Sequence, residues 1–188
     1  MKVLSLLFLL CLGGCQLWGT VINGGHRLYA IVDDDRTAKD DWTDVQINAS
    51  VRDALSQRSG ALLVDVEVTV FEGSVLLTGI VPKGEVLTDI LEATWSVPGV
   101  RKVYNYVRVG EPPQTFDVTR EALLAASIKT KLALAAGIDA TNYKLTLENG
   151  VIYLMGICKD DSEYTKVLSI LKNTEGVDKI IYLMRRPI

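Results

Sequence analysis

The chain has 188 residues, a formal net charge of −3 at pH 7 and 48% hydrophobic residues. A chain of this length and hydrophobicity can form one or two domains with apolar cores. The slightly acidic balance disfavours a nucleic-acid-binding protein, because such proteins need a basic surface.

The first residues have the order of a secretory signal. Lys2 supplies a positive charge, an apolar stretch of about nine residues follows, and Gly13 and Gly14 precede Cys15. The apolar stretch is too short to cross a bilayer, which takes about 20 residues. We therefore expect residues 1–14 to be a removable signal. The alternative is a buried N-terminal helix, which the lack of amphipathic spacing disfavours.

The segment 12–15, Leu-Gly-Gly-Cys, resembles the lipobox of bacterial lipoproteins. In that family the cysteine becomes the first residue and carries several acyl chains, which together make anchoring stable. The resemblance implies lipid attachment at Cys15, and Gln16 after it implies the outer membrane, facing the periplasm. Only Cys158 would then remain, so no internal disulfide is expected.

We expect residues 15–43 to form a lipidated tether. The tether contains His26, the single histidine of the chain, so the folded part has no histidine for a Ser/His/Asp catalytic set. Phosphate-binding and nucleophile-elbow motifs are absent as well. We expect no enzyme activity, no cofactor and no metal site, and we interpret Asp33–Asp35 as a solvated segment.

The rest of the chain repeats itself at an offset of 77 residues. Residues 44–108 then align with 121–185 without a gap, with 15 identities in 65 pairs. Solenoid repeats have periods of about 20–50 residues. The longer period predicts the duplication of a whole domain.

The sequence pattern of each copy predicts the element order α-β-β-α-β. In the first copy, residues 45–57 predict a helix because Ile47, Val51 and Leu55 form one apolar stripe. Strands are expected over 64–71, 75–81 and 103–109, and a second helix over 83–97. Glu72-Gly73, and Asn149-Gly150 in the second copy, predict hairpin turns with positive φ. The fold class is therefore α+β, with two helices packed on a small mixed three-stranded sheet in each copy.

The expected boundaries follow from the repeat. The first domain spans 44–109, a linker 110–116, and the second domain 117–188. A domain of about 65 residues is only marginally stable alone, and a short Pro-rich linker is fairly stiff. We therefore expect the two copies to contact each other.

Both copies resemble the BON domain, a periplasmic module whose hairpin is written roughly Gly-x-Val-x-Leu-x-Gly and whose last strand follows a Gly-Val pair. The matching residues are Gly73, Val75, Leu77, Gly79, Gly99 and Val100, and then Gly150, Ile152, Leu154, Gly156, Gly176 and Val177. A lipobox followed by two such domains implies binding to an anionic phospholipid membrane, support of outer-membrane integrity and enrichment at division sites. We interpret the glycines themselves as scaffold.

The first helices of the two copies differ on their outward side. Gln46, Ser50, Asp53 and Gln57 of the first copy become Leu123, Ser127, Thr130 and Leu134, and no acid occurs between Glu121 and Asp139. A helix over 117–136 with a wide apolar arc and nearby lysines is typical of a lipid interface. The family resemblance implies the same helix, and the predicted phospholipid-binding residues are Leu123, Ser127, Thr130, Lys131 and Leu134. The alternative is that the two leucines pack against the first domain or the linker.

Two other features have competing interpretations. Cys158 is read as a small packing residue rather than a reactive thiol, since no folded histidine can activate it. The segment 160–163, Asp-Asp-Ser-Glu, is read as a helix N-cap and acidic first turn rather than a cation site.

Two functions remain open from the sequence. The leading hypothesis is a lipid-anchored protein that binds anionic phospholipid through its second domain. The alternative is an envelope protein-binding module, a chaperone or assembly factor, whose exposed sheet edges would take a partner strand.

Overall fold

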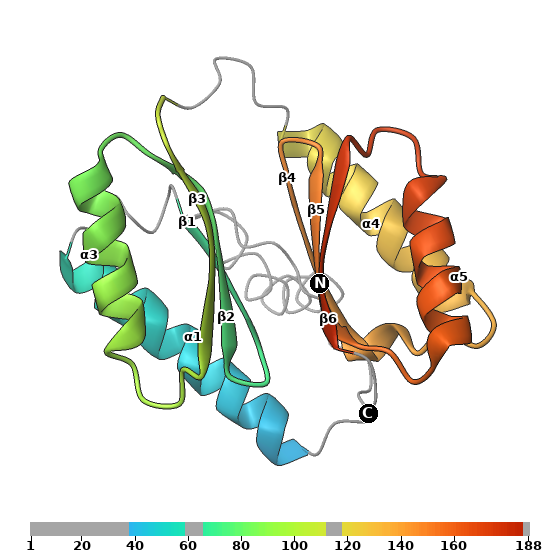
Figure 1. The fold of residues 1–188 in the computed structure, drawn as a ribbon, viewed down its shortest axis with the longest axis horizontal. Coiled ribbons are helices and arrows are strands. Elements are labelled where there is room, and N and C mark those ends of the chain that lie inside the picture. The colour runs from blue at the N-terminus through green and yellow to red at the C-terminus, as the bar shows by residue number, and fades with distance from the viewer. Residues whose placement is uncertain (1–37, 59–65, 112–117, 186–188) are drawn as a thin grey trace, which may run out of the picture. The chain divides into compact units, whose positions relative to one another are not determined.

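The computed structural model describes residues 38–58, 66–111 and 118–185 (Figure 1). Residues 32–188 form one compact unit, and a second unit, 1–31, lies outside the described residues. The predicted signal, Cys15 and most of the predicted tether also fall outside them. The elements of the first copy are α1 (Ala38–Arg58), β1 (Val66–Phe71), β2 (Ser74–Val81), α3 (Gly84–Trp95) and β3 (Lys102–Val109); those of the second are α4 (Val118–Leu134), η1 (Ala140–Asn142), β4 (Tyr143–Glu148), β5 (Val151–Ile157), α5 (Asp161–Lys172) and β6 (Lys179–Arg185).

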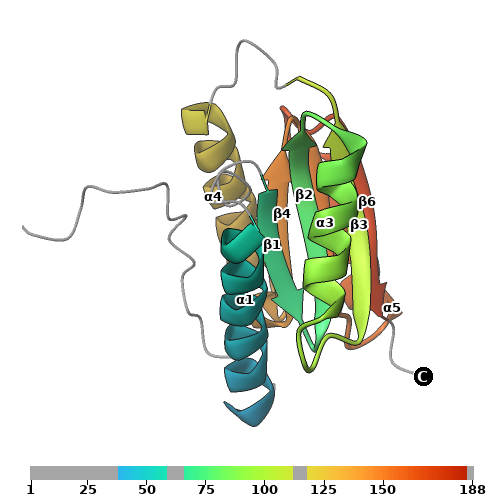
Figure 2. The ribbon, with the colours of Figure 1, turned by 90° about the vertical axis from the view of Figure 1, so that its left-hand side faces the viewer.

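Each copy forms a mixed three-stranded sheet. The strand orders are β1-β2-β3 and β4-β5-β6. In both sheets the hairpin pair is antiparallel and the last strand pairs parallel with the second. Two helices lie on one face of each sheet (Figures 1 and 2). The predicted fold class is therefore confirmed in both copies.

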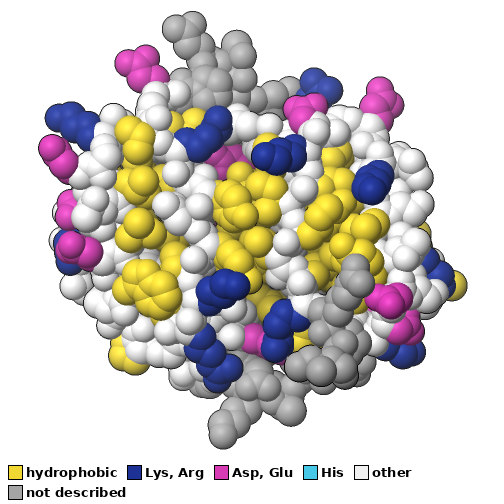
Figure 3. Space-filling view, in the orientation of Figure 1, with side chains coloured by type: hydrophobic (Ala, Val, Ile, Leu, Met, Phe, Trp, Pro, Cys, Tyr) yellow, Lys and Arg dark blue, Asp and Glu magenta, His cyan; other side chains and the backbone are white. Residues whose placement is uncertain are grey.

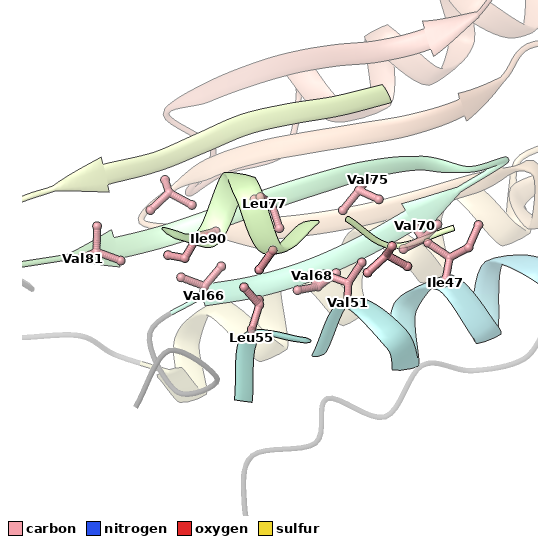
Figure 4. Packing of buried hydrophobic residues seen from close by; sticks show 13 residues of the cluster. Ile47, Val51, Leu55, Val66, Val68, Val70, Val75, Leu77, Val81 and Ile90 are labelled. Atoms are coloured by element: carbon pink, nitrogen blue, oxygen red, sulfur yellow. The ribbon is translucent and has the colours of Figure 1, made fainter. Parts of the chain in front are cut away.

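The core of the first domain lies between its helices and its sheet (Figure 4). The predicted stripe of α1 is buried, with 3% of Ile47 and none of Val51 or Leu55 exposed. Ile128 and Leu132 take the corresponding places in α4, at 0% and 2% exposed. The helical periodicity of both first helices is thus explained by the sheet face that they cover.

A carboxylate of each first helix binds the hairpin turn beside it. Asp44 accepts hydrogen bonds from the backbone N–H groups of Glu72 and Gly73, at 2.7 and 2.9 Å. Glu121, its equivalent in the repeat, accepts one from Gly150 N–H at 3.2 Å. Both residues of each turn have positive φ, as expected: 46° and 70° in the first hairpin, 49° and 74° in the second. Such turns match the twist of the strands that they join.

Most expected boundaries lie within two residues of the observed ones, and two larger differences occur. α1 begins at Ala38, well before the expected start at Val45. A single helical turn, η1, precedes β4, and the side chain of Asp139 accepts from the N–H of Thr141 at 3.1 Å to begin it. The stripe of α1 starts only at Ile47, so hydrophobic spacing could not locate the true start of the helix.

The faces of the two sheets that carry no helices contact each other. At the contact the hydroxyl groups of Thr69 and Thr146 lie 2.9 Å apart and are buried. The rings of Tyr106 and Tyr153 meet at 5.0 Å with a tilt of 57°. Phe71, Leu76, Tyr153 and Met155 form the buried cluster between the sheets. The expected contact between the copies is therefore present.

Candidate functional site

The outward side of α4 presents two leucines to solvent. Leu123 is 67% exposed and Leu134 is 81% exposed. The exposed residues Ser127 and Thr130 lie between them on the same side of the helix. At 1.5 Å per residue the two leucines are about 16 Å apart along the helix axis. Both side chains are therefore exposed rather than packed into the core of either domain.

The opposite side of α4 holds the helix in place. Ile128 and Leu132 are buried and Leu124 is half-buried against the second sheet. On the outward side, the hydroxyl of Thr130 donates to the carbonyl of Ala126 at 2.9 Å. This local bond satisfies the hydroxyl within the helix. Because the Thr130 hydroxyl already has a hydrogen-bond partner, the outward side of α4 is less polar than its sequence suggests.

Basic residues flank this outward side. Lys131 is exposed, and its Nζ lies 3.2 Å from the Thr174 hydroxyl. Arg120 is exposed and Lys129 is half-buried. The carboxylate of Glu121 is directed to the hairpin of its own domain, where it accepts from Gly150 N–H. The stretch from Leu123 to Leu134 therefore has an exposed leucine at each end, two small hydroxyl residues between them and basic residues beside it.

The equivalent side of α1 is polar, and two of its side chains form a hydrogen bond with each other. Gln46, Ser50, Asp53 and Gln57 are wholly or partly exposed there. The Gln57 amide donates to Asp53 at 2.8 Å. This side of the first domain offers no leucine to a membrane, so the two copies are not interchangeable at this position.

Within 38–58, 66–111 and 118–185, no helix is long and apolar enough to cross a membrane.

The BON domain model matches residues 43–111 and 120–186. The chain belongs to the BON domain family. It is 33% identical over 121 residues to an "Uncharacterized protein in gshII 5'region" of Anaplasma centrale, covering 64% of this chain and 80% of that one. It is 27% identical over 179 residues to the outer membrane lipoprotein DolP of Haemophilus influenzae, covering 93% and 89%. It is 27% identical over 116 residues to the 21 kDa hemolysin of Actinobacillus pleuropneumoniae, covering 62% and 59%.

The glycines of the BON pattern serve the backbone. Gly73 has a φ of 70°, and a Cβ there would lie 2.8 Å from the carbonyl oxygen of Gly99. A Cβ at Gly156 would collide with the carbonyl of Asn142. These positions exclude larger side chains because the backbone of a neighbouring segment approaches closely. The pattern therefore marks the fold and not a binding site.

Cys158 and the segment after it have structural roles. Cys158 is completely buried, and its Sγ lies 3.7 Å from Met184 Sδ. Asp160 begins α5 by accepting from Glu163 N–H at 2.8 Å, as the N-cap interpretation predicts. Among the described residues no group of three or more His, Cys, Asp or Glu side chains could hold a metal ion.

One buried carboxylate was not expected from the sequence. Glu163 is 1% exposed and accepts backbone N–H bonds from Asp139 at 2.8 Å and Lys159 at 2.6 Å. It joins the loop after α4 to the loop after β5. Nearby, burial raises the pKa of Tyr143, and Cys158 and Glu163 add to the shift. These groups are enclosed by the core of the second domain, and nothing in their arrangement opens to a substrate.

Proposed function

We propose that this chain is a non-enzymatic, lipid-anchored envelope protein that binds anionic phospholipid through α4 and supports outer-membrane integrity. The observation that carries the proposal is the exposure of Leu123 and Leu134 on a helix with basic flanks. The alignment with an outer membrane lipoprotein over 93% of the chain supports attachment at Cys15 and a position at the outer membrane.

The expected strength of the α4 contact is modest. A leucine moved fully from water into an apolar phase contributes about 1.5–3 kcal/mol. Each lysine or arginine near an anionic membrane surface adds about 1 kcal/mol. Ordering the protein at the surface opposes these terms. We therefore expect a weak, reversible contact that depends on the acyl anchor to hold the protein at the membrane.

Co-sedimentation with lipid vesicles tests the proposal. The experiment uses residues 16–188 without the acyl chains, and vesicles of phosphatidylcholine with or without one-third phosphatidylglycerol. We expect binding to the anionic vesicles only, weakened by added salt because surface charges are screened. The double variant Leu123→Glu/Leu134→Glu should weaken binding by about tenfold or more, since it removes the apolar contact and repels the surface.

The repeat provides a matched control. Gln46→Glu/Gln57→Glu adds the same two charges at the equivalent positions of α1. This control should leave vesicle binding within about twofold. Equal losses in the two double variants, or equal binding to neutral vesicles, would contradict the role of α4. In cells, replacing the native chain with the α4 variant should increase entry of a membrane-impermeant dye.

A further inference from the structure

The last strands of the two domains carry the same pattern on their facing sides. Alternate residues of β3 are Lys102, Tyr104, Tyr106 and Arg108, and the equivalent residues of β6 are Lys179, Ile181, Leu183 and Arg185. The four apolar side chains pack partly buried against the cluster between the sheets. Alternation along a strand places the lysine and arginine of each strand on the same side. We call the surface formed by these eight residues the edge groove.

The edge groove lies between two unpaired strand edges. β3 is bonded only to β2, and β6 only to β5, among the described strands. Figure 3 looks onto this side, where apolar side chains gather between lysine and arginine side chains above and below. On β3, the Asn105 side chain accepts from Val107 N–H at 3.0 Å and so occupies one backbone donor. β6 is therefore the edge better suited to receive another strand.

The two ends of the edge groove differ. At one end Arg185 forms an ion pair with Glu72, and the Phe71 side chain is buried. At the other end a cavity of about 320 Å³ is lined by Arg108, Lys179 and Tyr153, among other residues. The repeat equivalent of Phe71 is Glu148, which lines this cavity. This cavity therefore lies at the end where the repeat has a carboxyl group in place of an apolar ring.

The residues that line this cavity carry more positive than negative charge. Arg108 and Lys179 are exposed, and Glu148 is half-buried. Burial raises the pKa of Glu148 and the nearby carboxylates of Glu67 and Glu121 add to the rise, while the Thr78 hydroxyl and the charge of Arg108 oppose it. The cavity lining itself carries two cations, Arg108 and Lys179, and one carboxyl group, Glu148. An anionic group can enter this end with a favourable electrostatic interaction.

We propose that the edge groove binds an extended acidic peptide segment of a partner protein. The segment adds a strand to β6, places alternate apolar side chains over Tyr104 and Tyr106, and puts a carboxylate between Arg108 and Lys179. The six steps from Lys102 to Arg108 correspond to about 20 Å of strand, which fits a segment of about seven residues. The cavity at the Arg108 end can admit a side chain of an extended peptide, whereas a flat bilayer would lie across its mouth. This inference goes beyond the α4 membrane contact and does not depend on it.

Fluorescence anisotropy with a designed probe tests the inference. The probe is a labelled nine-residue peptide with two aspartates at each end and alternating valine and threonine between them. The acceptor is the chain from residue 16, and Arg108→Glu/Lys179→Glu is the test variant. We expect saturable binding to the native chain and a rise in Kd of about tenfold or more in the variant, since the carboxylate loses both of its partners.

The matched control makes the same charge change elsewhere in the second domain. Lys159→Glu/Lys172→Glu alters two exposed lysines outside the edge groove. Its Kd should stay within about twofold of the native value. Thermal melts of both variants establish that each is folded. A probe with alternate backbone amides methylated should not bind, because it cannot pair with a strand edge.

Several results would overturn the inference. They are no saturable binding of the probe, equal losses in the two charge variants, or full binding of the methylated probe. The variant Leu123→Glu/Leu134→Glu lacks the α4 membrane contact. It therefore shows whether the edge groove binds a lipid or a peptide. If anionic vesicles displace the peptide from that variant, the edge groove is a lipid site and not a peptide site. If that variant binds the peptide normally and vesicles do not compete, the inference is supported independently of the proposed function.

Discussion

α1 and α4 are two versions of one helix. Both bury an apolar stripe against a three-stranded sheet, at Val51 and Leu55 in the first and Ile128 and Leu132 in the second. On the outward side, glutamines at the ends of one stripe correspond to exposed leucines in the other. The sheet restricts the inner positions in both copies, while the outer positions are free to diverge. A difference between repeats at an outward position is therefore a guide to function.

The largest expected effect is on the free energy of unfolding, which should respond to substitutions on the inner side of α4 and not to those on its outward side. Leu132→Ala should lower the free energy of unfolding by about 2–5 kcal/mol, because it leaves a cavity in the core. Leu134→Ala should change it by less than about 0.5 kcal/mol, since that side chain is already in water. Urea unfolding of the two variants measures both. Similar losses would show that Leu134 is packed.

A graft tests whether the outward stripe is sufficient. Gln46→Leu/Asp53→Thr/Gln57→Leu gives α1 the outward residues of α4. Introduced together with Leu123→Glu/Leu134→Glu, the graft should restore part of the binding to anionic vesicles, by roughly three- to fivefold over that variant. The gain should fall short of the native level because Asp89 and Glu92 lie next to Arg58 and reduce the local positive charge. No gain would mean that α4 needs more than these positions.

The smallest effect concerns the contact between the sheets. Burial raises the pKa of Glu148 in the folded chain, so the folded state holds its proton at pH values where the unfolded state has lost it. Stability contributed by this group is present below the ordinary glutamate pKa and is lost as the pH rises through the folded value. Glu148→Gln should raise the Tm at pH 7–8 by a degree or two, on the order expected for a partly buried surface group.

The matching measurement is a set of thermal melts from pH 4 to pH 8. At pH 4 the native chain and Glu148→Gln should melt at the same temperature, because the native carboxyl is then protonated in the folded state. A lower Tm of the variant at neutral pH would show that the carboxylate is stabilised by Arg108 more than burial disfavours it.

The fold was predictable because its signals are local and occur twice. The spacing of Ile47, Val51 and Leu55 gave one helix, alternation gave the strands, and two-residue turns gave the hairpins. The repeat then tested each prediction against a second copy. The start of α1 at Ala38 was missed because the apolar stripe begins only at Ile47. η1 was missed because a three-residue turn set by Asp139 has no hydrophobic period.

The surfaces were harder to predict than the core. Sequence placed Leu123 and Leu134 on the outward side of a helix, but exposure also depends on where the other domain lies. The edge groove was missed for a related reason. The alternating pattern of β6 shows two apolar faces, and only the structure shows that Ile181 and Leu183 face the other sheet across two free edges. The burial of Glu163 gave no signal because one of its partners, the N–H of Asp139, is 24 residues away in the sequence.

The hydroxyl contact between Thr69 and Thr146 joins two positions exactly one repeat apart. A residue meets its own counterpart only where a two-fold axis passes through a contact, so the two sheets meet as the subunits of a symmetric homodimer would. In a true homodimer every substitution appears twice. Within one chain each half changes alone, so a buried Phe71 at one end of the contact corresponds to a half-buried Glu148 beside a cavity at the other end.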